Sequence, residues 1–255
     1  MAPMIFILFF LNFSFAETPL SSIRPYNEDY KNYLNQNTDP DLPSFETALS
    51  ANQNIQNEPW KNMTESNISP EDLQKLFIDI RDQQPLRDQN GNLRRLTWLF
   101  PDDGCFARSA LAQNFASHLP NTKLKQIFIF GNLDAKTPNH PSGHVTWWYH
   151  VAPIIKTSYG AFAIDPAIDP SRPIFVNDWI EKILPNRSDA KVSLCSPATF
   201  GPQSFCKTYS PIDTDQAIGI ETNTYLRLEW QRVQGLGRDP QKELGPEPPW
   251  NFFLN

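Results

Sequence analysis

Residues 101–108 read Pro-Asp-Asp-Gly-Cys-Phe-Ala-Arg, and they place one cysteine where turn-forming residues give way to an apolar helical pattern. Small and apolar residues recur at helical spacing from Ala107 to Phe115, which predicts a helix whose first turn holds Cys105. There the unpaired backbone N–H groups and the positive end of the helix dipole favour the nucleophilic thiolate over the thiol. A lone cysteine taken by itself is more often a small packing residue, so the prediction depends on further residues.

A histidine and an aspartate follow in two segments that are rich in aromatic and branched residues. Residues 147–152 read Trp-Trp-Tyr-His-Val-Ala, and residues 161–166 read Ala-Phe-Ala-Ile-Asp-Pro. The two segments predict an antiparallel hairpin. If a symmetrical four-residue loop, 156–159, joins the strands, His150 lies opposite Asp165, close enough for the carboxylate to hold the imidazole by a hydrogen bond.

Cys105, His150 and Asp165 would then supply the nucleophile, the base and the orienting carboxylate of covalent acyl transfer. Asp169, in the proline-containing loop that follows, is the competing partner for the histidine. We expect no metal and no cofactor, because the other histidines show no ligand spacing with cysteine or carboxylate; they are His118, His140 and His144.

At this point the chain resembles a known family, the bacterial protein-glutaminases, which are secreted enzymes that deamidate glutamine side chains within proteins. The similarity runs from about Ser69 to about Tyr209, and the family's catalytic Cys, His and Asp fall on Cys105, His150 and Asp165. Four motifs carry it in the same order, at residues 103–108, 130–133, 147–152 and 164–166. The resemblance implies an α+β fold with a papain- and transglutaminase-like core, in which an antiparallel sheet packs on the helix that carries the cysteine.

The resemblance also implies an activity, the deamidation of protein-bound glutamine to glutamate through a thioester on Cys105, with release of ammonia. The partners would be proteins or peptides with exposed glutamine. A transglutaminase or a papain-like protease is an alternative because the same triad serves all three reactions, and a secreted binding protein with this fold is another. The segment Thr137–Gly143 lacks the cysteines that the family carries there, so we expect this loop to affect substrate preference.

The first sixteen residues predict export. Ile5–Phe15 is a short apolar run, and Ser14-Phe15-Ala16 suits cleavage by signal peptidase after Ala16. The run is too short to span a bilayer, but it lacks a preceding Lys or Arg, so an uncleaved anchor is the alternative. We expect a secreted or periplasmic protein that is soluble and monomeric after cleavage.

The composition changes between residues 17 and 67, where Asn, Gln, Ser, Pro and acidic residues dominate. Residues 17–90 contain 13 acidic and 6 basic residues, whereas residues 91–255 contain 15 acidic and 16 basic ones. The family resemblance implies that residues 17–67 are a removable pro-segment that covers the site; a linker is the alternative. We expect the catalytic domain at residues 68–255, and no nucleic-acid partner, because neither half shows a basic patch with interleaved aromatics.

Local patterns predict several elements and one disulfide. Ser69 is expected to cap a helix with an apolar stripe, Ile127–Phe130 to form a central strand buried on both faces, and Asn177 to cap a helix that runs to Leu184. A further helix should lie within residues 215–233, followed by an extended Pro-rich tail from Asp239. Three cysteines in an exported chain suggest one disulfide, Cys195 with Cys206, which leaves Cys105 free.

Overall fold

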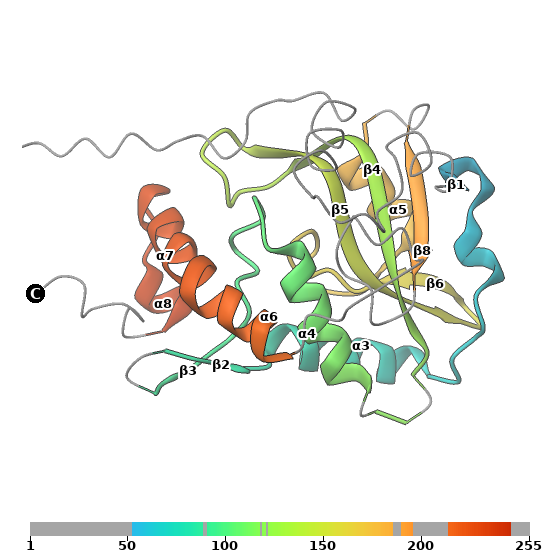
Figure 1. Ribbon diagram of the computed structural model, residues 1–255, viewed down its shortest axis with the longest axis horizontal. Coiled ribbons are helices and arrows are strands. Elements are labelled where there is room, and N and C mark those ends of the chain that lie inside the picture. Colours follow the sequence, from blue (N-terminus) through green and yellow to red (C-terminus); the bar gives the residue numbers. More distant parts are fainter. Residues whose placement is uncertain are drawn as a thin grey trace, which may run out of the picture.

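The fold is mixed α/β and is built on antiparallel sheets. The computed structural model describes residues 53–88, 91–117, 119–120, 122–185, 190–195 and 214–245. A six-stranded sheet in the order β1-β8-β4-β5-β6-β7 forms its centre, and a two-stranded sheet, β2-β3, lies apart from it (Figure 1). The long strands of the six-stranded sheet are β4 (Leu124–Lys136) and β5 (His144–Thr157). Its short strands are β1 (Gln53–Asn54), β8 (Lys191–Cys195), β6 (Gly160–Ala163) and β7 (Ile174–Phe175).

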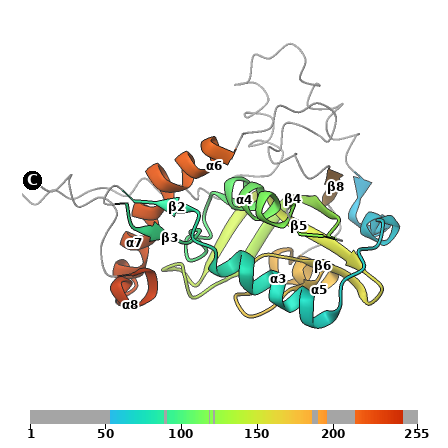
Figure 2. The ribbon, with the colours of Figure 1, turned by 90° about the horizontal axis from the view of Figure 1, so that it is seen from below.

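The central strand β4 is buried on both faces, as its apolar run predicts. Ile127 and Ile129 belong to one core cluster together with residues of α5 (Val176–Ile183), whereas Phe128 and Phe130 belong to another together with the first residue of α4 (Cys105–Ser117). All four side chains are at most 1% exposed. Helices α4 and α5 therefore cover opposite faces of the sheet (Figure 2).

The predicted helix after Ser69 is α3 (Pro70–Asp82). The Ser69 hydroxyl accepts a hydrogen bond from the backbone N–H of Asp72 at 3.1 Å, which satisfies one of the unpaired donors of the first turn. Its apolar stripe is buried against α4 and consists of Leu73, Leu76, Phe77 and Ile80.

Residues 53–67 pack on the folded body, and the domain boundary expected at residue 68 stays a prediction. β1 pairs with β8, and two short 3₁₀ turns follow, at Ile55–Asn57 and Pro59–Asn62. They bury Ile55, Trp60 and Met63 in the core cluster that also holds α5. Polar composition predicts a separate segment, but three well-spaced apolar side chains suffice to dock it. The predicted signal peptide and residues 17–52 lie outside the described residues.

The hairpin of β5 and β6 has a tighter turn than predicted. Thr157 pairs with Gly160 across the two-residue turn 158–159, and Ile154 pairs with Ala163. The predicted four-residue loop is therefore wrong, and the register is displaced by two residues. A displacement by two keeps every side chain on its predicted face, whereas a displacement by one would have reversed them all.

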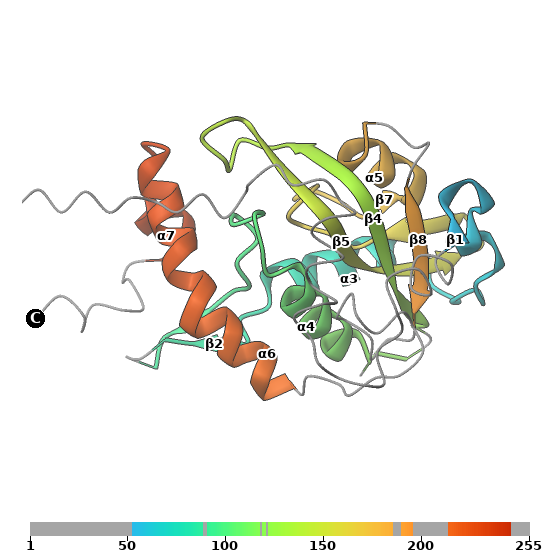
Figure 3. The ribbon, with the colours of Figure 1, turned by 45° about the horizontal axis from the view of Figure 1, so that its top comes forward.

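The predicted C-terminal helix is a continuous run of three parts, α6 (Thr214–Ile220), a π-helical turn (Glu221–Tyr225), here labelled η4, and α7 (Leu226–Gly235). It lies beside α4 and beside the small sheet of β2 (Leu86–Arg87) and β3 (Leu93–Arg94) (Figure 3). No helix in the described part of the chain is long and apolar enough to cross a membrane.

Two local predictions are wrong, one for the start of a helix and one for a segment expected to be extended. The residue before α5 is Phe175, and Asn177 lies inside the helix, where its side-chain amide donates to Glu58 Oε1 at 2.9 Å. After Asp239 the chain forms α8 (Pro240–Leu244) instead of an extended segment, because the Asp239 carboxylate accepts from two backbone N–H groups and Pro240 suits the first helical position. The tail after residue 245 lies outside the described residues.

Candidate active site

Cys105 is the first residue of α4, as the sequence predicts, and it is a free thiol that is 8% exposed. The turn before it requires Gly104, whose φ is +82°. A side chain at this position would also collide, because an added Cβ would lie 2.9 Å from the ring of Tyr225 and 2.9 Å from Arg108 Nη1. Gly104 therefore lets the backbone before the thiol pass close to the C-terminal helices.

His150 and Asp165 are in contact and buried, with 2% and 6% of their surfaces exposed. His150 Nε2 lies 2.8 Å from Asp165 Oδ2. Asp165 follows the end of β6, where the backbone N–H of Ile164 still donates to the carbonyl of Pro153 at 2.9 Å. Continuing this register, Asp165 would face Ala152, so His150 is its diagonal neighbour on the same face, within reach of a long side chain. The predicted contact is confirmed although the predicted pairing is not.

Two tryptophans hold this pair. Trp179, on the buried face of α5, donates from Nε1 to Asp165 Oδ2 at 2.9 Å. Trp147 stacks on the imidazole with ring centroids 5.1 Å apart, and its Nε1 donates to the carbonyl of Asp102 at 3.0 Å. Strict alternation along β5 would place Trp147 and His150 on opposite faces, but the pairing of β4 with β5 shifts between Phe130 and Leu133.

Electrostatics favour a charged pair. Burial alone would lower the pKa of His150, but the negative charge and hydrogen bond of Asp165, together with Cys105, raise that pKa from 6.5 to about 9. Burial opposes ionisation of Asp165 as well, yet His150, Trp179 and Arg108 hold the pKa of this carboxyl below its ordinary value. The imidazolium and the carboxylate are therefore the favoured forms at neutral pH.

The three predicted residues line one small cavity of about 10 Å³. The volume is room for about one water molecule. Cys105 and Arg108 reach it from α4, His150 from β5, and Asp165 from the segment after β6. His150 Nδ1 is buried and has no hydrogen-bond partner among the described residues, so the nitrogen that does not face Asp165 is the one available to the thiol.

Asp169, the competing carboxylate, is engaged elsewhere. It accepts hydrogen bonds from Ser171 at 2.6 Å and from Lys182 at 3.1 Å. Of the two carboxylates that the sequence offers, the structure brings only Asp165 to His150.

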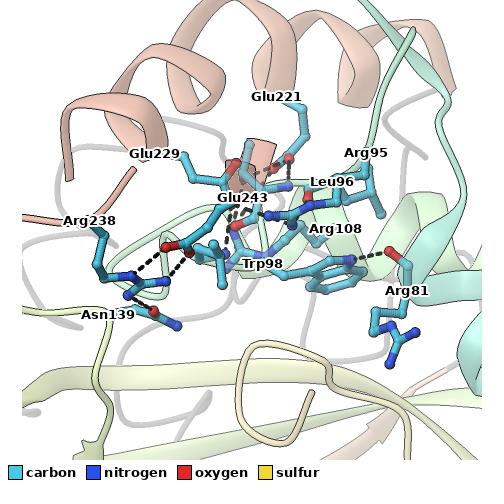
Figure 4. Close-up of polar contacts among 12 residues, drawn as sticks. Arg81, Arg95, Leu96, Trp98, Arg108, Asn139, Glu221, Glu229, Arg238 and Glu243 are labelled. Carbon is cyan, nitrogen blue, oxygen red and sulfur yellow. Dashed lines mark hydrogen bonds and ion pairs between the residues drawn. The ribbon is translucent and has the colours of Figure 1, made fainter. Parts of the chain in front are cut away.

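Sequence reasoning missed a polar cluster in which side chains of the C-terminal helices bind the segment just before Cys105, here called the cysteine segment (residues 97–105) (Figure 4). Glu221 accepts from the backbone N–H and the hydroxyl of Thr97 at 3.1 and 2.8 Å, and Glu229 accepts from the backbone N–H of Leu99 at 2.7 Å. Both carboxyl groups are buried, which raises their pKa values, that of Glu229 to about 7. The only signal in the sequence is two glutamates eight residues apart on a helix that otherwise buries apolar side chains.

The other three histidines do not line this cavity in the described part of the chain. His144 contacts Asp134 at 2.9 Å, His140 lies 3.7 Å from Asp102, and His118 lies outside the described residues. Within the described ranges, no group of His, Cys, Asp and Glu side chains is arranged to hold a metal ion. The predicted disulfide involves Cys206, which also lies outside them, and stays a prediction.

The loop Thr137–Gly143 is fastened to the C-terminal helices by two arginines. Arg232 donates to the carbonyl of Asn139 at 3.2 Å and also binds Asp102, whereas Arg238 donates to the side-chain oxygen of Asn139 at 2.6 Å. Hydrogen bonds from these two arginines therefore hold the loop, which contains no cysteine.

The fold is thus mixed α/β, and a buried Cys, His and Asp line one cavity at the start of α4. Part of the chain matches a known family. A family described as glutaminase matches residues 73–183, which include Cys105, His150 and Asp165. The match spans less than half of the chain, and the fold is similar to that of a solved pro-protein-glutaminase.

Several solved structures are similar to the chain. The crystal structure of a pro-protein-glutaminase is 21% identical with a TM-score of 0.50, over 65% of this chain and 61% of that one. A crystal structure of protein-glutaminase is 22% identical with a TM-score of 0.48, over 60% and 85% of the two chains. The NMR structure of protein-glutaminase from Chryseobacterium proteolyticum is 22% identical with a TM-score of 0.47, over 64% and 86%. No curated protein matches the sequence.

Proposed function

We propose that the protein is a secreted cysteine hydrolase that deamidates glutamine side chains in proteins, with Cys105, His150 and Asp165 as its catalytic residues. The observation that carries the proposal is the buried His150–Asp165 contact, 2.8 Å long, in the cavity that Cys105 also lines. The glutaminase family match over these residues supports the choice of substrate. A papain- and transglutaminase-like core is part of the same proposal.

In the first half of the reaction, the Cys105 sulfur attacks the carboxamide carbon of the glutamine. The thiol proton rests on His150 before attack, in keeping with a pKa raised to about 9. The carbon–nitrogen bond then breaks, His150 gives its proton to the departing nitrogen, and ammonia leaves. The backbone N–H of Cys105, in the first turn of α4, is one donor to the oxyanion.

In the second half, water attacks the thioester. His150 takes a proton from the water and the carbon–sulfur bond breaks. The products are a glutamic acid side chain, which loses its proton to solvent, and the Cys105 thiolate beside the protonated His150. Asp165 keeps Nε2 of the ring occupied in both halves, so Nδ1 always faces the reacting atoms. Trp147 and Trp179 restrict the ring from its two sides.

The test is ammonia release from a denatured, glutamine-rich protein without added metal or nucleotide. We expect ammonia and, by mass spectrometry, a substrate chain that stays intact while NH₂ groups are exchanged for OH. Cys105→Ser should abolish release, because a hydroxyl ionises far less readily than a thiol. Asp165→Asn should reduce it strongly, because the imidazole loses the partner that fixes its tautomer. Asp169→Asn is the matched control and should leave the rate unchanged, since Asp169 contacts Ser171 and Lys182 instead.

Other products would identify the alternatives. Substrate fragments on a gel would indicate a protease, and crosslinked ladders a transglutaminase. An unmodified substrate under every condition, with the region before residue 53 removed, would indicate a binding protein and would overturn the proposal.

A further inference from the structure

Arg108 is buried to 98% three residues after the cysteine, where a charge is costly unless it is balanced. Its Nη1 donates to the carbonyl and the hydroxyl of Thr97, both at 3.3 Å, and lies 4.0 Å from Glu221 Oε1. The guanidinium also lies over the ring of Trp98, 5.9 Å from its centroid. The side chain is therefore held in one orientation from several sides (Figure 4).

Arg108 reaches the same cavity as the reacting residues. It lines the cavity together with Asp165 and His150, and its second terminal nitrogen, Nη2, is buried without a hydrogen-bond partner among the described residues. A fixed positive charge beside a buried carboxylate favours the ionised carboxylate, and in this cavity water screens the attraction little.

We infer that Arg108 is a positioning residue for the reaction proposed above: its fixed charge, anchored by Glu221, keeps Asp165 ionised, the form that pairs with the His150 imidazolium. The inference rests on the proposed function for its role in deamidation, but its physical content, a charge effect on the thiol–imidazole pair, does not depend on the substrate. Arg108 does not touch the reacting atoms; it acts through Asp165.

Other ionisable groups also act on Asp165 and on Arg108. Asp165 is faced by His150 from β5, by Arg108 and Cys105 from α4, and by the neutral indole of Trp179 from α5. Arg108 is faced by Glu221 in η4, and it acts on Tyr225 and on Glu229 from the same helical run. Arg108 is the one cation that these interactions bring to Asp165 besides the imidazolium, within the described residues.

The test compares Glu221→Gln with the double variant Arg108→Met/Glu221→Gln. Arg108→Met alone would leave Glu221 buried without its cation and risk unfolding. The pair of variants differs only in the charge and hydrogen bonds of residue 108, and neither leaves the Glu221 carboxylate in the core. The probe is the rate of Cys105 alkylation by iodoacetamide from pH 4 to 10, with urea unfolding as the check that each variant is folded.

We expect the acidic limb of the alkylation profile to move to higher pH in the double variant, by about half a pH unit or more relative to Glu221→Gln, because Asp165 then protonates more readily. Coincident limbs, or a downward move, would overturn the inference. Arg108→Lys retains the charge without the guanidinium fork, so its limb should stay at the wild-type pH even if stability falls. An upward shift in this variant would show that geometry, and not charge, is what Arg108 supplies.

Steady-state deamidation distinguishes failure of the inference from failure of the proposed function. The loss in the double variant should fall on kcat with KM unchanged, because Arg108 does not touch the substrate. If the wild type releases ammonia but the variants share one alkylation profile, the inference fails alone. If no chain releases ammonia while the profiles differ as expected, the proposed function fails and the charge effect stands.

Discussion

At the residue scale, the raised pKa of His150 gives the folded protein a defined pH response. Folded and unfolded values of about 9 and 6.5 mean that protonation of the ring favours the folded state. The stabilisation is fully present below pH 6.5 and is lost as the pH rises through about 9. A shift of this size corresponds to on the order of 3 kcal/mol in the free energy of unfolding.

Imidazole titration by NMR checks this response in the Cys105→Ser chain, where no thiol titrates beside the ring. We expect a midpoint well above 6.5 for His150. Adding Asp165→Asn should bring the midpoint to 6.5 or below, because burial of the ring then acts without its counter-charge. An unchanged midpoint in the Asn variant would mean that Asp165 does not govern the ring.

At the scale of elements, the turn before α4 depends on the absence of a side chain at residue 104. Gly104→Ala should destabilise the protein and slow alkylation of Cys105, because its Cβ would displace the ring of Tyr225 and the guanidinium of Arg108. Gly143→Ala is the matched control: its φ of +77° is similar, but nothing lies within 4 Å of the added Cβ.

The control separates backbone strain from collision. Both variants should lose about 1–2 kcal/mol for a left-handed alanine, measured by urea unfolding. Only Gly104→Ala should lose a further ~1–3 kcal/mol for overpacking and show slower alkylation. Equal losses would mean that the close approach of the C-terminal helices to Gly104 does not matter for stability.

The hairpin of β5 and β6 shows what the sequence predicts and what it leaves open. Period-two alternation indicates which side chains share a face, and this sufficed to bring His150 and Asp165 together. The number of residues in the turn is a weaker signal, since Thr157 and Gly160 pair as readily as residues two positions away. Because a slip by two preserves the face, the contact was predictable from a wrong register.

Contacts between distant elements carry no such local signal. The indole of Trp179 reaches Asp165 only because α5 docks on the face of the sheet opposite α4, and Glu221 meets Arg108 only because η4 docks beside α4. The sequence predicts that both residues lie on helices, but docking angles are set by the whole core. The proximity of Cys105, His150 and Asp165 could therefore be predicted, whereas the residues that hold His150 and Asp165 could not.

At the scale of the whole molecule, the folded body includes residues 53–67. A chain beginning at residue 68 loses the buried side chains of Ile55, Trp60 and Met63 and should be at least about 3 kcal/mol less stable than one beginning at residue 53. Trp60→Ala in the full chain should reproduce much of this loss, whereas Asn62→Ala, an exposed neighbour, should not. Urea unfolding provides the measurement.

A second truncation tests the predicted pro-segment. If the part of the predicted pro-segment 17–67 that precedes residue 53 covers the site, a chain beginning at residue 53 should deamidate faster than one beginning at residue 17. Equal specific activity would show that these residues are only a linker. A chain beginning at residue 68 is unsuited to this comparison, because lost stability would mask any gain in access.

The anchors of the cysteine segment come late in the chain. Thr97 and Asp102 are held by Glu221 and Arg232, which follow them by 124 and 130 positions. On the ribosome, the thiol, the imidazole and the carboxylate all emerge before either anchor has been translated, and long-range contacts of this kind form slowly. A nascent chain therefore exposes the Cys105 thiol before the residues that support the preceding segment exist, and the order of synthesis delays the final placement of this thiol until the last helices have docked.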